Sequence, residues 1–400
     1  MKQISNFNFC LYTDILFGKD TEKEAGKMIK KHGGTRVMLV YGGGSVKKSG
    51  LFDRVVQSMK DEGLYFVELG GVQPNPRRSL VETGIKIMNK EKIDFLLALG
   101  GGSVMDTAKG IALALANDGE YWKFYNGVPV EKMGPVGTIH TLSATGSEMS
   151  RSTVLVDDME KGVKRSLLCD PCRPVFAIMN PELTYSVSAY QTAVGAVDIL
   201  AHSFNRYFMK EMHACRLADE FAEGLMRTVI KYTAVALAKP NDYQARAELM
   251  LAGSYSHNDL MQIGRSGMRG SEHPLEQQLS GHYDNAHGAG LAVVMPGWLQ
   301  FIVDNGTPDQ VARVAQFGVS VFGVRADMAD TKAAAIEGIA AFRLWIRSLG
   351  MPLTLKELSI PKSDIPAIAK RLVDVMNGKV PGIIDLEEKD IIAIYNSVAE

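Results

Sequence analysis

Three features are scarce in this chain of 400 residues, and each scarcity excludes a class of protein. The four cysteines are too few for a disulfide-rich scaffold of this length. No apolar run approaches the ~20 residues that span a bilayer, and the first residues lead into no apolar core like that of a signal peptide. The net charge is −1 with both signs interspersed, so no basic stripe indicates a nucleic-acid partner. We therefore expect a cytoplasmic protein that contacts neither membrane nor nucleic acid.

Two of the cysteines have the spacing of a redox motif. Cys169 and Cys172 are separated by an aspartate and a proline. Because cytosolic proteins as a rule keep their thiols reduced, we expect two reduced thiols in a turn.

The pattern of apolar residues changes near residue 181. Before it, short apolar runs alternate with amphipathic stretches, which predicts βαβ units and a mostly parallel sheet. After it, long patterns rich in Ala, Met and Leu predict helices. We therefore expect an α/β domain with a Rossmann-like sheet over 1–183 and an all-helical domain over 184–400, a division that suits the chain's length. The expected strands are 37–41, 65–69, 95–99, 136–141 and 175–179, and the expected helices are 189–209, 212–237, 241–262, 331–348 and 363–376.

Two Gly-Gly-Gly-Ser turns, at 42–45 and 100–103, follow two of the expected strands. Glycines at a strand-to-helix turn let backbone N–H groups approach an anion closely, as a pyrophosphate requires. Neither turn matches Gly-x-Gly-x-x-Gly or a P-loop, and each has the alternative of a tight connection that needs positive φ. The hydroxyl-rich segment 141–148 is a further candidate lining for a ribose or nicotinamide.

A carboxylate and three imidazoles form a candidate metal site. Asp198 and His202 are four residues apart in an expected helix, so both side chains lie on one face. The segment around them is apolar, and an unpartnered carboxylate there would be costly to bury. His273 and His287 follow in a histidine-rich stretch. Any single histidine is more often a surface or hydrogen-bonded residue, but the four together favour a metal, with Fe²⁺ and Zn²⁺ both compatible with the ligands.

These motifs together resemble the iron-dependent alcohol dehydrogenase family, within the dehydroquinate synthase-like fold. The resemblance covers nearly the whole chain and rests on the sequences at 100–109, 145–148 and 180–184, on Asp198 with His202, and on His273 with His287. The stretch 41–50 is similar to the butanol dehydrogenase and broad-range aldehyde reductase branch.

The resemblance implies a role for each of several residues. It implies that Asp198, His202, His273 and His287 are the metal ligands. It implies that the dinucleotide is bound by Gly43, Gly44, Ser45, Asn75, Gly101, Gly102, Ser103, Asp106, Thr141, Thr145 and Lys164. It also implies a homodimer.

The first glycine turn bears on the choice of dinucleotide. Relatives that prefer NAD place an acidic residue near the adenosine ribose, whereas here that neighbourhood holds Gly43, Gly44 and Ser45, with Lys47 and Lys48 close by. With no carboxylate to repel a 2′-phosphate and two cations to attract it, we expect a preference for NADP(H) over NAD(H).

One position departs from the family pattern. Many relatives carry a second histidine four residues after the first of the late pair, and this chain has Gln277 there. Glutamine forms hydrogen bonds but does not titrate near neutral pH. Either a chain of water molecules or His282 would then move the proton, or the substrate range differs from that of the relatives. Gln277 and His282 are the candidate residues near the proton relay.

The expected activity is reversible hydride transfer between NADPH and an aldehyde whose carbonyl is polarised by the metal, in a cleft beyond the carboxyl ends of the strands. One alternative is a metal- and nucleotide-dependent lyase like dehydroquinate synthase, which would need more basic residues for a phosphorylated substrate. Another is a nucleotide-binding relative that has lost catalysis. The sequence does not name the alcohol or aldehyde.

Overall fold

The computed structural model of the chain describes residues 3–160, 163–212, 214–267, 269–325 and 330–400. The backbone divides into two units, which we call the sheet unit and the helical unit. The sheet unit comprises Cys10–Val187 and Pro240–Asn258, and the helical unit comprises Met1–Phe9, Ser188–Lys239 and Asp259–Glu400. The domain boundary expected between residues 183 and 184 stays a prediction.

The sheet unit is built around six strands in the spatial order β1-β8-β5-β4-β2-β3. Every neighbouring pair is parallel. This confirms the predicted α/β fold with a mostly parallel sheet. The strands are β1 Asp14–Phe17, β2 Arg36–Tyr41, β3 Tyr65–Leu69, β4 Phe95–Gly100, β5 Val136–His140 and β8 Phe176–Met179.

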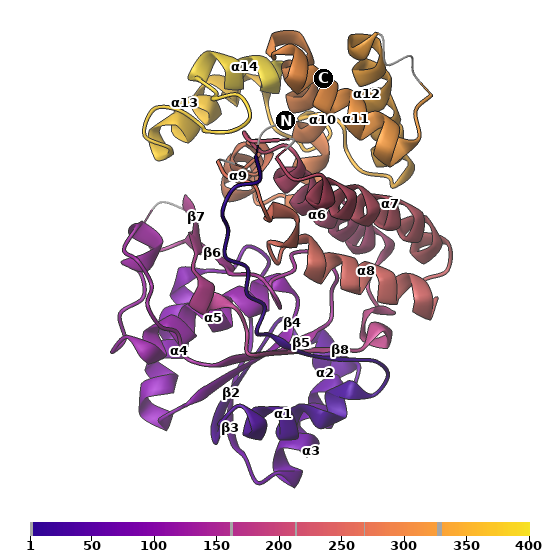
Figure 1. The fold of residues 1–400 in the computed structure, drawn as a ribbon. Helices are drawn as coiled ribbons and strands as arrows, with labels where there is room; N and C mark the ends of the chain where they lie inside the picture. The colour runs from indigo at the N-terminus through magenta and orange to yellow at the C-terminus, as the bar shows by residue number, and fades with distance from the viewer. Residues whose placement is uncertain (1–2, 161–162, 213, 268, 326–329) are drawn as a thin grey trace. The chain divides into compact units, whose positions relative to one another are not determined.

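Helices cover both faces of this sheet (Figure 1). Val37 and Leu39 of β2 pack in the core formed with α1 Ala25–Lys31 and α3 Leu51–Asp61. Met38 and Val40, which point to the opposite face, pack in the core formed with α4 Arg78–Glu91 and α5 Gly102–Ala116. Because both faces are buried, the strands are continuous apolar runs rather than alternating ones. That is why the sequence revealed the central strands.

The edge strand β1 and a second, two-stranded sheet were not predicted from the sequence. β1 is four residues long and only half-buried at the edge of the sheet, so its apolar signal is weak. β6 Ser152–Asp157 and β7 Val163–Leu168 pair antiparallel in a second sheet, with Val154 opposite Ser166. Residues 161–162, which connect them, lie outside the described residues.

The helical unit confirms most of the expected helices. The expected helices 189–209, 331–348 and 363–376 correspond to α6, α12 and α13. Helix α7 begins later than the predicted 212, and residue 213 of that prediction lies outside the described residues. The expected helix 241–262 ends earlier, as α8 Tyr243–Ser256 of the sheet unit. The helices are α6 Ala189–Tyr207, α7 Arg216–Ala238, α9 Glu272–Tyr283, α10 His287–Asn305, α11 Pro308–Phe322, α12 Thr331–Ser348, α13 Ile365–Val375 and α14 Glu388–Ser397.

Within the part of the chain that the structure describes, none of these helices combines the length and apolar character that a bilayer-crossing segment requires.

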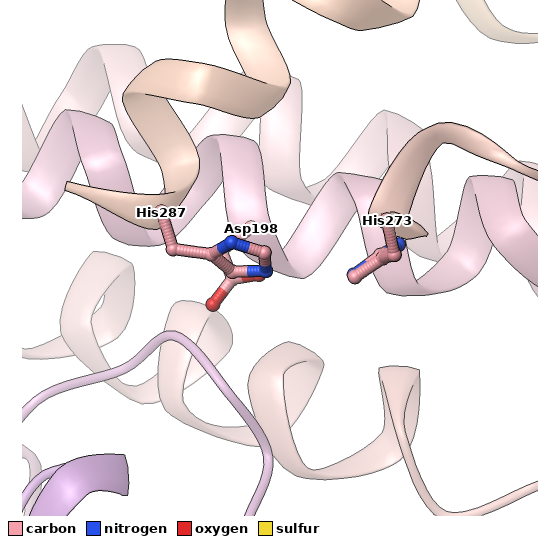
Figure 2. A group of neighbouring side chains, drawn as sticks. All are labelled: Asp198, His273 and His287. Atoms are coloured by element: carbon pink, nitrogen blue, oxygen red, sulfur yellow. The ribbon is translucent and has the colours of Figure 1, made fainter. Parts of the chain in front are cut away.

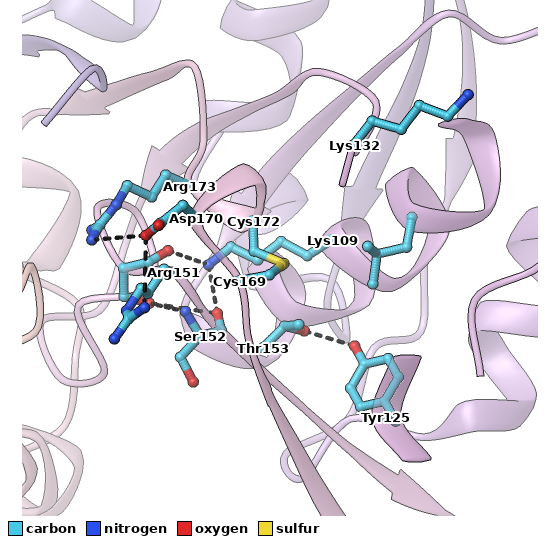
Figure 3. The surroundings of a disulfide bond; sticks show 12 residues. Lys109, Tyr125, Lys132, Arg151, Ser152, Thr153, Cys169, Asp170, Cys172 and Arg173 are labelled. Atoms are coloured by element: carbon cyan, nitrogen blue, oxygen red, sulfur yellow. Dashed lines mark hydrogen bonds and ion pairs between the residues drawn. A yellow bond between two sulfur atoms is a disulfide. The ribbon is translucent and has the colours of Figure 1, made fainter. Parts of the chain in front are cut away.

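Cys169 and Cys172 are joined by a disulfide (Figure 3). The expectation of two reduced thiols is therefore wrong for this pair. A short 3-10 turn, η3 Asp170–Cys172, brings the two Cα atoms to 5.3 Å, inside the range of about 4.4–6.8 Å that disulfides require. Both side chains are buried against the core that α4 and α5 form with the sheet.

Candidate functional site

The four side chains that the resemblance assigns to a metal come together in the helical unit. Asp198 Oδ1 lies 3.7 Å from Nε2 of His202 and 3.7 Å from Nε2 of His287. The centroid of the His273 ring lies 5.0 Å from that of His202 and 5.4 Å from that of His287. Figure 2 shows Asp198, His273 and His287, whose candidate ligand atoms all lie within 4.8 Å of one another.

Helix α6 supplies the first two of these residues. Its amino end is capped by Ser188, whose hydroxyl oxygen accepts from the backbone N–H of Gln191, a common way to satisfy a free donor at a helix start. Most of α6 is buried, including Asp198 and His202. Their spacing of four residues places both side chains on one face, as the sequence predicts.

Helices α9 and α10 supply the other two. His273 is the second residue of α9 and His287 the first residue of α10. The glycine after His287 allows α10 to start against α6, because a Cβ on Gly288 would lie 2.1 Å from the carbonyl oxygen of Val194. Two helix starts therefore bring histidines distant in sequence to the carboxylate of Asp198.

The four residues fit a divalent transition metal. Nε2 of His273 is buried and has no hydrogen-bond partner among the described residues, which is unusual for a buried ring nitrogen. A metal ligand bond would satisfy this atom. One carboxylate and three imidazoles is a donor set compatible with Fe²⁺ and with Zn²⁺.

The two candidates for the proton relay lie at different places on α9. Gln277 is four residues after His273, so it shares the face that carries His273. His282 is nine residues after His273, which is half a turn away on an ideal helix. His282 is exposed, and its Nδ1 lies 3.2 Å from Nη1 of Arg371 on α13. Helix geometry thus favours Gln277.

In the sheet unit, the second glycine turn leads into α5 as the sequence predicts. Gly101 precedes the helix, and Gly102 and Ser103 form its first turn. A Cβ on Gly102 would lie 2.3 Å from Oγ1 of Thr145. Glycine is therefore required at this position for the helix to begin against the 141–148 segment, which contains two further candidate dinucleotide residues, Thr141 and Thr145.

Asp106, the last candidate dinucleotide residue on α5, accepts hydrogen bonds from other residues of the sheet unit. Its Oδ1 accepts from Oγ of Ser147 at 2.7 Å, and its Oδ2 accepts from the backbone N–H of Val154 at 3.0 Å. Burial raises the pKa of this carboxyl above its usual range, against the opposing effect of the Lys109 ammonium. Asp106 thus holds the end of the 141–148 segment and the strand β6 to the start of α5.

Lys109, one helical turn further on, binds the end of this segment and the residues that follow it, and was not among the predicted site residues. Its Nζ is buried and donates to the carbonyl oxygens of Ser147, Ser150 and Ser152, at 2.7, 3.1 and 2.8 Å. Burial lowers its pKa to about 8. Figure 3 shows this amine near the Cys169–Cys172 disulfide.

The lowered pKa of Lys109 predicts how stability depends on pH. Its ordinary pKa of 10.5 is the value in the unfolded chain, so between about pH 8 and 10.5 the unfolded chain binds more protons than the folded one. Stability from this group therefore rises with pH across that window. We expect the free energy of unfolding of the wild type, relative to that of Lys109→Met, to increase from about pH 8 to 10.5. Urea denaturation of both proteins across the window measures this, with Lys86→Met on the exposed face of α4 as the control. A constant difference would contradict the expectation.

A carboxylate lies close to the first glycine turn, contrary to the expectation from the sequence. Gly43 and Gly44 end the turn after β2, and Ser45 begins the short helix α2 Ser45–Lys48. Lys47 Nζ lies 2.7 Å from Oε2 of Glu68, which also accepts from the hydroxyl of Tyr41 at 2.8 Å. The local sequence holds no carboxylate in this neighbourhood, but Glu68 supplies one. It comes from β3, which pairs with β2 in the sheet.

Two further candidate dinucleotide residues lie together in the sheet unit. Nζ of Lys164, on β7, donates to Oδ1 of Asn75 at 3.2 Å. Asn75 has a positive φ of 54°, a conformation in which asparagine is enriched. Thr141 follows β5, and its backbone N–H donates to the carbonyl oxygen of Gly100 at 3.2 Å.

A buried group of polar side chains surrounds Glu148, the last residue of the 141–148 segment, and none of them was among the predicted site residues. Nδ1 of His140 lies 3.2 Å from Oε2 of Glu148, and the hydroxyl of Ser254 donates to Oε1 of the same carboxylate. Burial alone would raise the pKa of Glu148, but His140 and the Ser254 hydrogen bond hold it below its usual value. His257, at the end of α8, bonds the carbonyl oxygen of Thr145 through Nδ1 at 2.8 Å. Nothing in the local sequence pairs these residues, because α8 is distant along the chain.

Comparisons with known proteins identify the family of the chain. Residues 13–181 match the family model of iron-containing alcohol dehydrogenase, and residues 192–399 match the C-terminal model of the same family. NADH-dependent butanol dehydrogenase A of Clostridium acetobutylicum is 37% identical, over 98% of each chain. NADPH-dependent aldehyde reductase YqhD of Escherichia coli is 34% identical, over 92% of this chain and 93% of that protein.

The chain is also similar to a solved structure of NADH-dependent butanol dehydrogenase A from Thermotoga maritima. The two are 34% identical in sequence, and their alignment covers 100% of each chain with a TM-score of 0.94. The two family models together span most of the chain. The chain is an oxidoreductase and belongs to the iron-containing alcohol dehydrogenase family.

Proposed function

We propose that the protein interconverts aldehydes and alcohols, using a nicotinamide dinucleotide and a divalent metal, Fe²⁺ or Zn²⁺. The observation that supports this most strongly is the cluster of Asp198, His202, His273 and His287, which has the donor set of a transition-metal site. Two relatives of the chain are named NADH-dependent butanol dehydrogenase A and NADPH-dependent aldehyde reductase. Short-chain aldehydes are accordingly the proposed substrates.

Each group of residues has a distinct task in this proposal. Asp198, His202, His273 and His287 would hold the metal, which when bound supplies a Lewis acid that polarises a carbonyl oxygen. Gly101, Gly102 and Ser103 present backbone N–H groups at the start of α5, where the helix terminus favours a phosphate. Asp106 and Lys109 keep the 141–148 segment against that helix start.

A direct assay tests the proposed activity. Purified protein, stripped of metal and reloaded with Fe²⁺ or Zn²⁺, is mixed with butyraldehyde and NADPH or NADH, and absorbance at 340 nm is followed. We expect oxidation of the dinucleotide that depends on aldehyde and on metal. Full aldehyde reduction by the metal-free protein would refute the role of the metal, and no turnover with any C2–C6 aldehyde would refute the substrate class.

We propose that the protein prefers NADP(H) over NAD(H), and that the carboxylate of Glu68 reduces this preference. Lys47 and Lys48 follow the first glycine turn and are both exposed, so they are available to a 2′-phosphate. The carboxylate of Glu68, paired with Lys47, opposes that attraction. The named relatives include both an NADH-dependent and an NADPH-dependent enzyme.

Removing the Glu68 charge should therefore increase the NADPH preference. For Glu68→Gln we expect the ratio of kcat/KM for NADPH to that for NADH to rise up to about fivefold, since exposed ion pairs contribute about 0.2–1 kcal/mol. Glu91→Gln is the matched control, because Glu91 accepts from the hydroxyl of Tyr65 at the opposite end of β3. A wild type that favours NADH would overturn the proposed preference, and an unchanged ratio would overturn the role of Glu68.

We propose that Gln277 replaces a titrating proton donor with a hydrogen-bonding one. In Gln277→His, aldehyde reduction should gain a dependence on protonated histidine, so its rate should fall as pH rises through about 6.5. General acid catalysis contributes roughly 10²-fold or more, which sets the size of the effect. Profiles of kcat between about pH 5 and 8 measure it. Gln278→His, one position along α9, is the control, and equal profiles for both variants would refute the proposal.

A further inference from the structure

Two buried carboxylates lie behind the imidazoles of the metal cluster. Glu272 Oε1 lies 2.9 Å from Nδ1 of His273, and Glu276 Oε2 contacts Nδ1 of His287. Both glutamates are on α9 and are fully buried. Neither was among the predicted site residues, although an acidic residue next to His273 is visible in the sequence.

These contacts fix which ring nitrogen is available to a metal. A carboxylate accepts a hydrogen bond, so Nδ1 of each histidine carries the proton and Nε2 keeps its lone pair. The Nε2 atoms lie where that lone pair is useful. Nε2 of His287 is 3.7 Å from Asp198 Oδ1, and Nε2 of His273 is buried without a hydrogen-bond partner among the described residues.

Each glutamate is itself held in place by a second donor. The side-chain amide of Asn205, on α6, donates to Oε1 of Glu272 at 2.6 Å and to the carbonyl oxygen of Gly270 at 2.9 Å. The hydroxyl of Ser280 donates to Oε2 of Glu276 at 3.2 Å. Glu272 is thereby tied to α6, the helix that carries Asp198 and His202.

The charge on these carboxylates is incompletely compensated by hydrogen bonds. Among the described residues, Oε2 of Glu272 and Oε1 of Glu276 are buried without a hydrogen-bond partner. A buried carboxylate with unsatisfied oxygens is costly unless a positive charge lies nearby. A divalent cation held by the adjacent imidazoles would supply that charge.

We propose that Glu272 and Glu276 are positioning residues that set the affinity of the cluster for its divalent cation. They hold Nε2 of His273 and His287 toward Asp198, and their negative charge stabilises the loaded site. This inference rests on the proposed function, because it concerns the same metal. It assigns to Glu272 and Glu276 an effect on metal affinity that is measurable without substrate.

Titration of the metal-free full-length protein with Co²⁺ tests the proposal, with visible absorbance reporting both binding and ligand geometry. For Glu272→Gln and Glu276→Gln we expect Kd to rise about 10- to 100-fold, with an altered cobalt spectrum. Glu272→Met, which also removes the hydrogen-bond acceptor, should bind more weakly than Glu272→Gln. Far-UV circular dichroism establishes that each metal-free variant is folded, and the isosteric Gln variants keep the test valid if Glu272→Met does not fold.

Glu388→Gln is the matched control. Glu388 is the first residue of α14, as Glu272 is of α9, but it is exposed. Both substitutions remove one negative charge from a helix start, where it has a favourable interaction with the helix dipole. The control should therefore bind Co²⁺ with the wild-type affinity and spectrum.

The possible failures are distinguishable. If the wild type binds Co²⁺ and all Glu272 and Glu276 variants bind it with the same affinity and spectrum, these glutamates are not positioning residues. If the wild type binds neither Co²⁺ nor Zn²⁺, both the proposed metal-dependent function and the role of the two glutamates are refuted.

Discussion

Replacing His273 by alanine is expected to remove the bound metal and the aldehyde reductase activity together. Asp198, His202 and His287 would remain, leaving three of the four proposed ligands. Structural zinc sites with four ligands bind with about 10–16 kcal/mol, so one ligand of such a site contributes about 3 kcal/mol, or more than 100-fold in affinity. A metal bound that much more weakly is lost during purification, and the Lewis acid that polarises the carbonyl is lost with it.

Metal analysis of the purified His273→Ala protein, beside turnover of butyraldehyde, measures both effects. His282→Ala is the matched control for metal content, because it removes a histidine from the same helix at an exposed position. Binding of NADPH, followed by its fluorescence, should persist in His273→Ala, since the candidate dinucleotide residues belong to the sheet unit. Activity that survives the loss of metal would refute the proposed role of the cluster.

Which parts of this site the sequence could reveal depends on whether the signal is local. The spacing of Asp198 and His202 is a local signal, and α6 places both on one face as predicted. Helix α10, which begins at His287, gave no periodic signal because nearly all of its side chains are buried and apolar. Its histidine was nevertheless a candidate ligand, because it lies in a histidine-rich stretch of the sequence.

Partners from other elements could not be predicted in the same way. Glu68 contacts Lys47 because β3 pairs with β2 in the sheet, and the order of the strands cannot be predicted from the sequence of either strand. Glu148 meets Ser254 because α8 belongs to the sheet unit although it follows the helical residues 188–239 along the chain. The sequence predicts the glycine turns because a strand followed by glycines and a helix is a contiguous pattern.

The second large effect is expected at Gly102, in the turn that leads into α5. A methyl group there would lie 2.3 Å from Oγ1, 2.5 Å from Cγ2 and 2.9 Å from Cβ of Thr145. Because the Cβ of Thr145 is fixed to its backbone, rotation of the side chain cannot relieve every contact. Gly102→Ala should therefore push the 141–148 segment away from the start of α5. The candidate dinucleotide residues of that segment would then be displaced from those at the helix start.

Overpacking of this kind costs about 1–3 kcal/mol, so we expect the Kd for NADPH to rise roughly 5- to 150-fold. Fluorescence titration with NADPH measures it. Gly224→Ala, in α7, is the control, because a Cβ on Gly224 meets nothing closer than 3.7 Å. If Gly224→Ala weakens binding as much as Gly102→Ala, the contact with Thr145 is not responsible. Metal content should be unchanged in Gly102→Ala, because the cluster around Asp198 lies in the helical unit. Gly102→Ala would then weaken the binding of NADPH and keep the metal, whereas His273→Ala would lose the metal and keep NADPH. This is the result expected if the sheet unit binds the dinucleotide and the helical unit binds the metal.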